Sequence, residues 1–261
     1  MPDQNVLQIM TIGFSLALLA GLETWFPFRA GRERSRHAAR NLFLGIGNAA
    51  LVAITITPLL MRIADRAETT GIGLLRMVTL PPWLQLALAI LLLDGWMYLW
   101  HRANHRLPLL WRFHQAHHSD TELDVTSAVR FHTGEILLSG VLRLALVPLL
   151  GLSLWQVFLY DALLAPFVLW QHGNVRLPER VDELLRLVFT TPAMHRTHHS
   201  QIRRETDSNY ASIFSFWDRL GRTMTLHRDM RSLTYGLSSL PPHAGATLSS
   251  LLRLPFMSMP R

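Results

Sequence analysis

The chain of 261 residues contains no cysteine, and all 25 of its Lys+Arg residues are arginine. Without cysteine, disulfides, thiolate zinc sites and iron–sulfur clusters held by protein thiolates are excluded. Charged residues are also few, at 16%, whereas hydrophobic residues reach 49% and the mean hydropathy is +0.20. This composition is more apolar than that of ordinary soluble domains. It predicts an integral membrane protein in which any metal is held by nitrogen and oxygen atoms.

Three apolar stretches are long enough to cross a bilayer, namely residues 6–26, 41–61 and 83–100. About 20 helical residues are needed to cross a hydrocarbon core about 30 Å thick. A fourth apolar region, residues 136–171, is interrupted near its middle by a proline and a glycine, which predicts a helical hairpin of two shorter spans. We expect residues 1–261 to form one all-α, polytopic membrane domain with three long transmembrane helices, this hairpin and a histidine-rich helical cap.

The placement of arginine predicts how the chain is oriented in the membrane. Five arginines crowd residues 27–40, whereas the arginines of residues 64–82 are offset by acidic residues. Because cytoplasmic connections carry the excess of basic residues, the first connection is expected inside and the N-terminus outside. The cap, residues 101–135 and 172–228, and a tail, residues 229–261, then lie on the cytoplasmic side. Basic residues beside spans usually meet anionic lipid headgroups, so no nucleic-acid partner is expected.

Histidine is concentrated in one part of the chain, and eight histidines form three tight groups. These groups are His101 and His105, then His114, His117 and His118, then His195, His198 and His199. On a helix, positions i, i+3 and i+4 share a face, so H-x-x-H-H is expected to present three imidazoles to a single point. Eight nitrogen donors are too many for one tetrahedral ion and suit two metals of higher coordination. The groups therefore predict a binuclear site.

The groups are expected at helix ends, and two further histidines are candidates to join them. The third span runs directly into the first group, and Pro108 is expected to end that helix and let a second one begin. His172 ends the returning arm of the hairpin at the level of the groups, which favours a ligand. His132, with Glu135 one turn later, is either a ligand or a hydrogen-bonding residue. His37, His227 and the remaining lone histidine, His243, are expected to be surface residues.

The type and number of ligands narrow the choice of metal. Imidazole suits iron, zinc and copper, but structural zinc closes at four ligands. Eight to ten nitrogens shared between two ions leave room for oxygen or water, which favours iron, while zinc and copper stay open as occupants. Ligation requires neutral imidazoles, so metal is expected to be lost as the pH falls below about 6.

The groups and the residues around them form a pattern that resembles the fatty acid hydroxylase / sterol desaturase superfamily. The matching segments are residues 101–105, 110–119, 130–135, 172–174, 191–200, 209–210 and 216–223. Their order, spacing and flanking residues agree together, and the resemblance extends over residues 90–225. One departure is Thr133, because many members have proline after the single histidine.

The resemblance implies an integral-membrane, non-haem di-iron oxygenase that activates O2 and attacks an unactivated C–H bond of a fatty acyl chain, a sterol or a related lipid. The three groups would bind the two irons, with His172 and His132 completing the set. Electrons would come from an external donor, either a redox protein such as a ferredoxin or cytochrome, or a reduced pterin. We expect hydroxylation, by analogy with members of similar layout. Desaturation at the same di-iron site is the alternative.

Several polar residues near these motifs are expected to support the ligands through hydrogen bonds. They are Asp94, Tyr98, Glu135, Asn174, Asn209 and Asp218. Asp94 lies about 10 Å before His101 along the helix, so it either orients the N–H of a neighbouring ligand or pairs with another helix. In the hairpin, Arg143 and Asp161 lie about nine residues on either side of the turn, which predicts an ion pair within the membrane.

Two functions of other classes also fit a histidine-rich membrane protein. A divalent-metal transporter needs ligands near the bilayer midplane along a path, whereas these histidines lie at span ends on one side. An inactive scaffold would keep the metals only for folding. Metal binding without O2 consumption would indicate the scaffold.

Overall fold

The structure is a computed structural model that describes residues 4–30, 34–241 and 244–257. Within these residues the secondary structure is helical, and β-type pairing is limited to isolated bridges. In chain order the helices are α1 (Gln4–Trp25), α2 (Arg34–Thr70), η1 (Leu74–Arg76), α3 (Pro82–Arg106), α4 (Pro108–His118), η2 (Val125–Val129), α5 (Thr133–Leu150), α6 (Leu154–His172), α7 (Glu179–Leu185), α8 (Pro192–His198), α9 (Arg203–Thr206), α10 (Phe216–Leu220), α11 (Leu248–Arg253) and η3 (Leu254–Phe256). The all-α prediction is confirmed.

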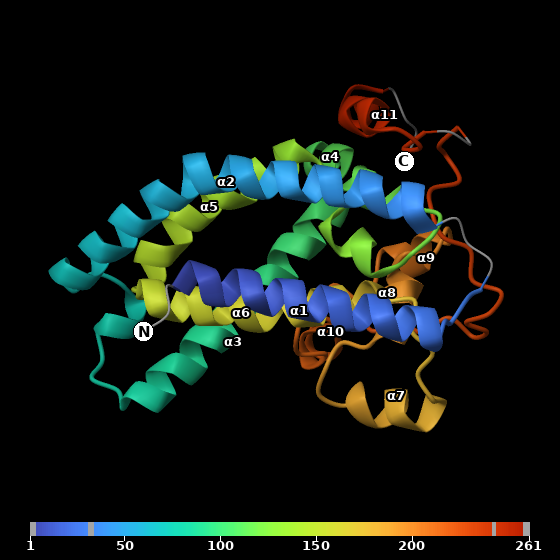
Figure 1. Cartoon of the computed structure of the whole chain (residues 1–261). Coiled ribbons are helices and arrows are strands. Elements are labelled where there is room, and N and C mark those ends of the chain that lie inside the picture. The colour runs from blue at the N-terminus through green and yellow to red at the C-terminus, as the bar shows by residue number, and fades with distance from the viewer. Residues whose placement is uncertain (1–3, 31–33, 242–243, 258–261) are drawn as a thin grey trace.

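The long helices α1, α2, α3, α5 and α6 form the body of the molecule (Figure 1). Helix α1 lies along α6 and α2 lies along α5, while α3 packs against α6 and continues into α4. The short helices α4, α8, α9 and α10 gather at one end of this body. Since α3 and α6 finish at that end and α5 begins there, the chain segments that carry the histidine groups meet at one end of the bundle.

Four helical segments are long and apolar enough to cross a membrane: Val6–Trp25, Arg34–Arg76, Pro82–Arg106 and Thr133–Leu150. They correspond to the three predicted long spans and to the first arm of the predicted hairpin. The second arm, α6, is also helical but does not belong to these four. It contains Asp161 and several other polar residues, which lower its hydropathy.

The predicted hairpin is formed by α5 and α6. Gly151, with φ of 73°, closes α5 in the left-handed conformation that glycine adopts without strain. Ser153 then starts α6, because its hydroxyl accepts from the backbone N–H of Gln156 while the Gln156 side chain accepts from the Ser153 N–H. Further along the arms, Arg143 Nη2 donates to Asp161 Oδ1 at 2.7 Å. The predicted ion pair between the two arms is confirmed.

Asp94 in α3 anchors a distant segment of the chain to the bundle. Its carboxylate accepts hydrogen bonds from the backbone N–H groups of Ile213 and Phe214, the indole of Trp217 and the hydroxyl of Tyr160. These four hydrogen bonds offset the cost of burying the carboxylate inside an apolar body. Of the two roles weighed for Asp94, pairing with other elements is the one observed.

His37 is buried, and the prediction that it is a surface residue was wrong. Its Nδ1 lies 2.9 Å from Asp124 Oδ2 and its Nε2 lies 2.8 Å from Asp120 Oδ1. The reason is tertiary, because the first turns of α2 pack on η2 and the loop before it. His227 is partly exposed and hydrogen-bonds to a glutamate. His243 lies outside the described residues.

Candidate metal centre

Nine histidines converge into two adjacent clusters at the cap end of the bundle. The first cluster comprises His101, His105, His114, His118 and His198, and the second comprises His117, His172, His195 and His199. Within each cluster the candidate ligand atoms all lie within 4.8 Å of one another. The two clusters touch, since the rings of His118 and His199 stack with centroids 4.4 Å apart. This arrangement brings together all eight residues of the three groups, together with His172.

The H-x-x-H-H groups divide between the clusters, and the expectation that each points to a single site was wrong. In α4, His114 and His118 enter the first cluster while His117 enters the second. At 100° per residue, neighbours such as His117 and His118 point in clearly different directions, whereas residues four apart lie almost in line. Each of these groups therefore gives two ligands to one cluster and one to the other.

Hydrogen bonds from Nδ1 to backbone carbonyls orient four of these rings. The Nδ1 atoms donate to the carbonyl oxygens of Tyr210 from His101 at 2.9 Å, of Ser208 from His198 at 2.6 Å, of Arg130 from His117 at 3.3 Å and of Val168 from His172 at 2.7 Å. A ring that carries its proton on Nδ1 keeps the lone pair on Nε2. These bonds therefore set the tautomer that binds metal through Nε2.

The Nε2 atoms of the second cluster face one another at distances that suit binding of a shared cation. His172 Nε2 lies 3.1 Å from His117 Nε2 and 2.9 Å from His195 Nε2, and His199 Nε2 lies 3.2 Å from His195 Nε2. Because the Nδ1–H groups of His117 and His172 already donate to carbonyls, their Nε2 lone pairs point at each other. These nitrogens would hold a metal ion, and coordination would replace this repulsion, so the residues fit a metal.

The residues of the first cluster also fit a metal. The Nε2 atoms of His114, His118 and His198 are buried and have no hydrogen-bond partner among the described residues. Burial lowers the pKa of His118, and it lowers the pKa of His198 to about 3. In the second cluster burial likewise lowers the pKa of His199. These rings are therefore neutral near pH 7 and available as ligands.

Two carboxylates lie against the first cluster. Glu135 accepts from His114 Nδ1 at 2.9 Å, as expected for a residue that supports a ligand. Asp207 Oδ1 lies 3.6 Å from His105 Nδ1, and its Oδ2 lies 3.6 Å from Arg203 Nε. Asp207 was not predicted from the sequence, although its position eight residues after a histidine group was a visible signal. The backbone carbonyls that accept from the histidine Nδ1 atoms could not be predicted from the sequence, because every residue has a carbonyl.

The other residues predicted to support the ligands form hydrogen bonds with the chain segments around the ligands. Asp218 accepts from the backbone N–H groups of Tyr210 and Ala211, and Tyr98 hydrogen-bonds to Thr223 at 3.0 Å. Asn209 donates to the carbonyl of Met194 in α8. Together they hold the segment whose carbonyls orient His101 and His198.

Asn174 lies on the other side of the centre. It donates to the carbonyl of Arg29, and its backbone N–H donates to Glu23, which ties the end of α6 to the first connection. None of these four side chains has a described hydrogen bond to a clustered histidine, whereas Glu135 does.

The structure does not bring His132 into either cluster. Its Nδ1 accepts from the backbone N–H of Gly134 at 2.9 Å, so it caps the start of α5. Its Nε2 donates to the carbonyl of Leu252 at 3.2 Å. Thr133, at the position where proteins of the resembled superfamily often have proline, is the first residue of α5 and donates to Asn48. His132 therefore supports the start of α5 and the C-terminal segment, and both its nitrogens are engaged there.

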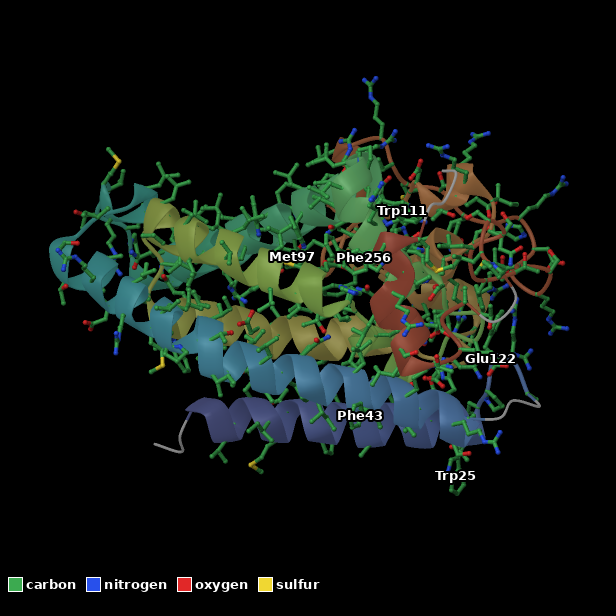
Figure 2. All side chains as sticks on the ribbon, turned by 90° about the horizontal axis from the view of Figure 1, so that it is seen from above. Trp25, Phe43, Met97, Trp111, Glu122 and Phe256 are labelled. Atoms are coloured by element: carbon green, nitrogen blue, oxygen red, sulfur yellow. The ribbon has the colours of Figure 1, made fainter. Side chains whose placement is uncertain are left out.

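An inner cavity of about 230 Å³ reaches both clusters from among the long helices. Its apolar wall includes Met97, Trp100, Ile136, Leu164 and Val168, and its other wall is formed by histidines of both clusters. Figure 2 shows Met97 among the long helices. A long apolar molecule lying between the helices would thus end at the metal centre.

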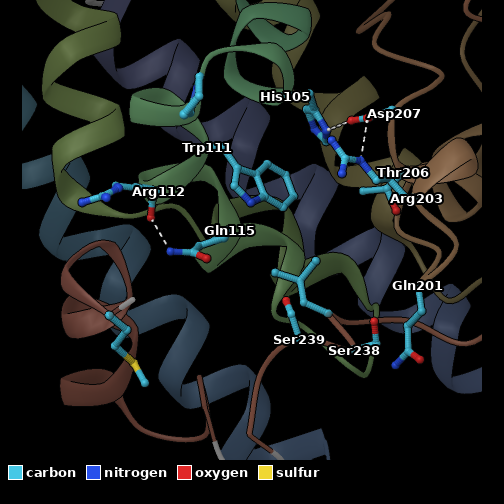
Figure 3. Close-up of a pocket in the computed structure, with 13 residues that line it drawn as sticks. His105, Trp111, Arg112, Gln115, Gln201, Arg203, Thr206, Asp207, Ser238 and Ser239 are labelled. Carbon is cyan, nitrogen blue, oxygen red and sulfur yellow. Dashed lines mark hydrogen bonds and ion pairs between the residues drawn. The ribbon is translucent and has the colours of Figure 1, made fainter. Parts of the chain in front are cut away.

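A second cavity of about 690 Å³, here called the outer basin, opens on the cap (Figure 3). His105 lies at its inner side next to Asp207, and Trp111 projects into it from α4. Its rim carries arginine, glutamine and serine side chains. The outer basin and the inner cavity share no lining residue, so two separate cavities border the clusters.

Comparison with known proteins gives one family match. The family model described as fatty acid hydroxylase matches residues 86–223, which is close to the extent of the resemblance in the sequence. This segment includes every clustered histidine and both walls of the inner cavity. No solved structure matches the chain significantly.

Curated relatives share this region. An ornithine lipid hydroxylase of Rhizobium tropici is 36% identical over 137 residues, which is 52% of this chain and 40% of the relative. Human alkylglycerol monooxygenase is 31% identical over 168 residues, 62% of this chain and 36% of the relative. A cholesterol 25-hydroxylase-like protein of Danio rerio is 29% identical over 154 residues, 58% of each chain. The matched segment spans less than two thirds of each of these relatives.

Proposed function

Since the chain belongs to the fatty acid hydroxylase family, we propose that it is an O2-dependent lipid hydroxylase of the membrane that uses two non-haem iron ions. The observation that carries this proposal is the pair of buried histidine clusters at the end of an apolar cavity between long helices. Relatives named as hydroxylases and monooxygenases support hydroxylation over desaturation.

The two clusters would hold the two irons through imidazole nitrogen. When bound, iron supplies the activation of O2 needed to attack an unreactive C–H bond. The protein's own part is position and exclusion of water. Hydrogen bonds from Nδ1 of His101, His117, His172 and His198 to carbonyls hold the rings in place. Glu135 keeps a proton on Nδ1 of His114.

The substrate would be a membrane lipid, either a fatty acyl chain, a sterol or a related lipid. The names of the relatives refer to ornithine lipid, alkylglycerol and cholesterol, all of which carry long apolar portions. An apolar chain entering between α3, α5 and α6 would bury its surface against Met97, Leu164 and Val168. Its reacting carbon would then lie beside the histidines, away from bulk water.

Electrons would reach the centre through the outer basin. This basin is exposed on the cap and reaches His105, so an external donor, either a redox protein or a reduced pterin, would approach there without displacing the lipid. We place the cap on the cytoplasmic side and the N-terminus outside, because arginines crowd the first connection at the same end as the cap.

The proposal is tested with the full chain purified in lipid nanodiscs. We expect two irons per chain and, with O2, a reductant and a panel of membrane lipids, a product that has gained one oxygen atom. A product with a new double bond and no added oxygen would identify a desaturase instead. Iron binding without O2 consumption on any lipid would contradict the enzyme assignment, and metal flux into sealed vesicles would indicate the transporter.

A further inference from the structure

The two H-x-x-H-H groups share one rule for distributing their side chains. In each, the residues at i and i+4 enter one cluster and the residue at i+3 enters the other. His114 and His118 belong to the first cluster and His117 to the second. In α8 and the residue after it the roles of the clusters are exchanged, since His195 and His199 belong to the second cluster and His198 to the first.

The first group has the same spacing with one substitution. It reads H-x-x-N-H, so His101 and His105 take the i and i+4 positions and Asn104 takes the i+3 position. Both histidines lie in the first cluster. By the rule of the other two groups, the residue at i+3 faces the second cluster, which has four histidines where the first has five.

The surroundings of Asn104 agree with this placement. Asn104 is 1% exposed, and it lines the inner cavity together with three members of the second cluster, His117, His172 and His195, and two of the first, His101 and His114. Its Oδ1 is buried and has no hydrogen-bond partner among the described residues. A buried amide oxygen without a partner is unfavourable and is uncommon in folded proteins, so it requires a ligand or another function.

We propose that Asn104 supplies its amide oxygen as a fifth protein ligand to the metal of the second cluster. This inference rests on the proposed function, in which both clusters hold metal. Amide and carbonyl oxygens are accepted ligands of divalent metals, and an amide oxygen is neutral and a weaker donor than imidazole to iron. The second cluster is therefore the more labile of the two metal sites. It is also the one with most of its histidines on the inner cavity.

The test measures metal binding and spectra in the full chain without lipid turnover. Asn104→Leu removes the oxygen with little change in size, whereas Asn104→His recreates H-x-x-H-H and restores a donor. Met97→Leu is the matched control, because Met97 lies on the same helix and lines the same cavity. Protein in nanodiscs is loaded with Fe(II) under anaerobic conditions, and iron stoichiometry, stepwise affinity and the Mössbauer spectrum are recorded.

We expect Asn104→Leu to keep one iron at wild-type affinity and to bind the other at least about ten-fold more weakly, with one of two Mössbauer components altered. Asn104→His should bind two irons as tightly as the wild type or more tightly, and Met97→Leu should bind both irons with wild-type affinity. The inference is overturned if Asn104→Leu binds both irons with wild-type affinity and spectrum, or if it weakens both equally. If the wild-type chain itself fails to bind two irons, the proposed function fails first, and the two failures are thereby distinguished.

Discussion

At the scale of single residues, the decisive property of each histidine is which of its nitrogens is engaged. A ring that donates from Nδ1 to a carbonyl keeps Nε2 for metal, as His117 and His172 do. A ring with both nitrogens engaged elsewhere has none left, as for His132. The distinction separates ligands from structural histidines more sharply than proximity to a motif.

Substitution of a ligand histidine and substitution of a structural histidine should therefore have different effects on iron binding. We expect His117→Ala to reduce bound iron from two towards one per chain and to reduce lipid oxygenation by at least about 100-fold, because a ligand is lost. His132→Ala, the matched control, should keep both irons and lose stability at the start of α5 instead. The measurements are iron content by mass spectrometry and product yield. Equal iron loss in the two variants would contradict the assignment.

The buried rings also predict how stability depends on pH. Burial lowers the pKa of His198 from 6.5 to about 3, so between these values the folded metal-free chain binds fewer protons than the unfolded chain. Stability then rises with pH through this window and is lost as the pH falls. From His198 alone we expect a loss of about 2 kcal/mol between pH 7 and pH 5.

Denaturant titrations of the metal-free protein in detergent at several pH values measure this loss. The variant His198→Asn should show a shallower dependence, because it removes one titrating group. The same protonation should release metal from the loaded protein below about pH 6. A free energy of unfolding that stays constant from pH 7 to pH 5 would argue against neutral, buried rings.

At the scale of elements, contacts between distant segments hold the helices that carry the ligands. Asp94 joins α3 to the segment at residues 213–217, and the Arg143–Asp161 pair joins α5 to α6. The proline and glycine near the middle of the apolar region 136–171 predicted that α5 and α6 form a hairpin, and the similar distance of the two charges from its turn predicted their contact. The partners of Asp94 lie 66 to 123 residues away in sequence and were not predictable from local pattern.

The contribution of the ion pair between the hairpin arms to stability can be measured with a double-mutant cycle. Arg143→Leu leaves Asp161 without its partner in an apolar environment, and Asp161→Leu leaves Arg143 in the same position. Since both side chains are about one quarter exposed, we expect each single change to cost about 1–2 kcal/mol, with the double change no worse than either. Thermal unfolding in mixed micelles measures this. Additive losses would show that the two charges do not interact.

At the scale of the whole molecule, the absence of cysteine makes the proposed orientation directly measurable. Single cysteines can be introduced at Ser239, which is exposed on the rim of the outer basin, and at Met77, which is 80% exposed in the connection between α2 and α3. In intact cells we expect an impermeant maleimide to label Met77→Cys and not Ser239→Cys. Permeabilised cells should label both. The reverse pattern in intact cells would place the cap outside.

The sequence by itself determined the class of the protein, because the relevant signals are local. Apolar runs of about 20 residues indicate spans wherever they occur, and histidines at i, i+3 and i+4 indicate a metal-binding helix face without knowledge of its neighbours. The eight grouped histidines and His172 could therefore be named from spacing and position alone.

Tertiary structure alone decided how the histidines are divided between the two clusters and the structural roles. The division of each H-x-x-H-H group between two clusters, the burial of His37 between two aspartates and the capping role of His132 all depend on which segments pack together. The two cavities also depend on tertiary packing, since their walls come from elements that are far apart in the chain. Local pattern specifies the direction of a side chain relative to its own helix, whereas its partner is set by packing between helices.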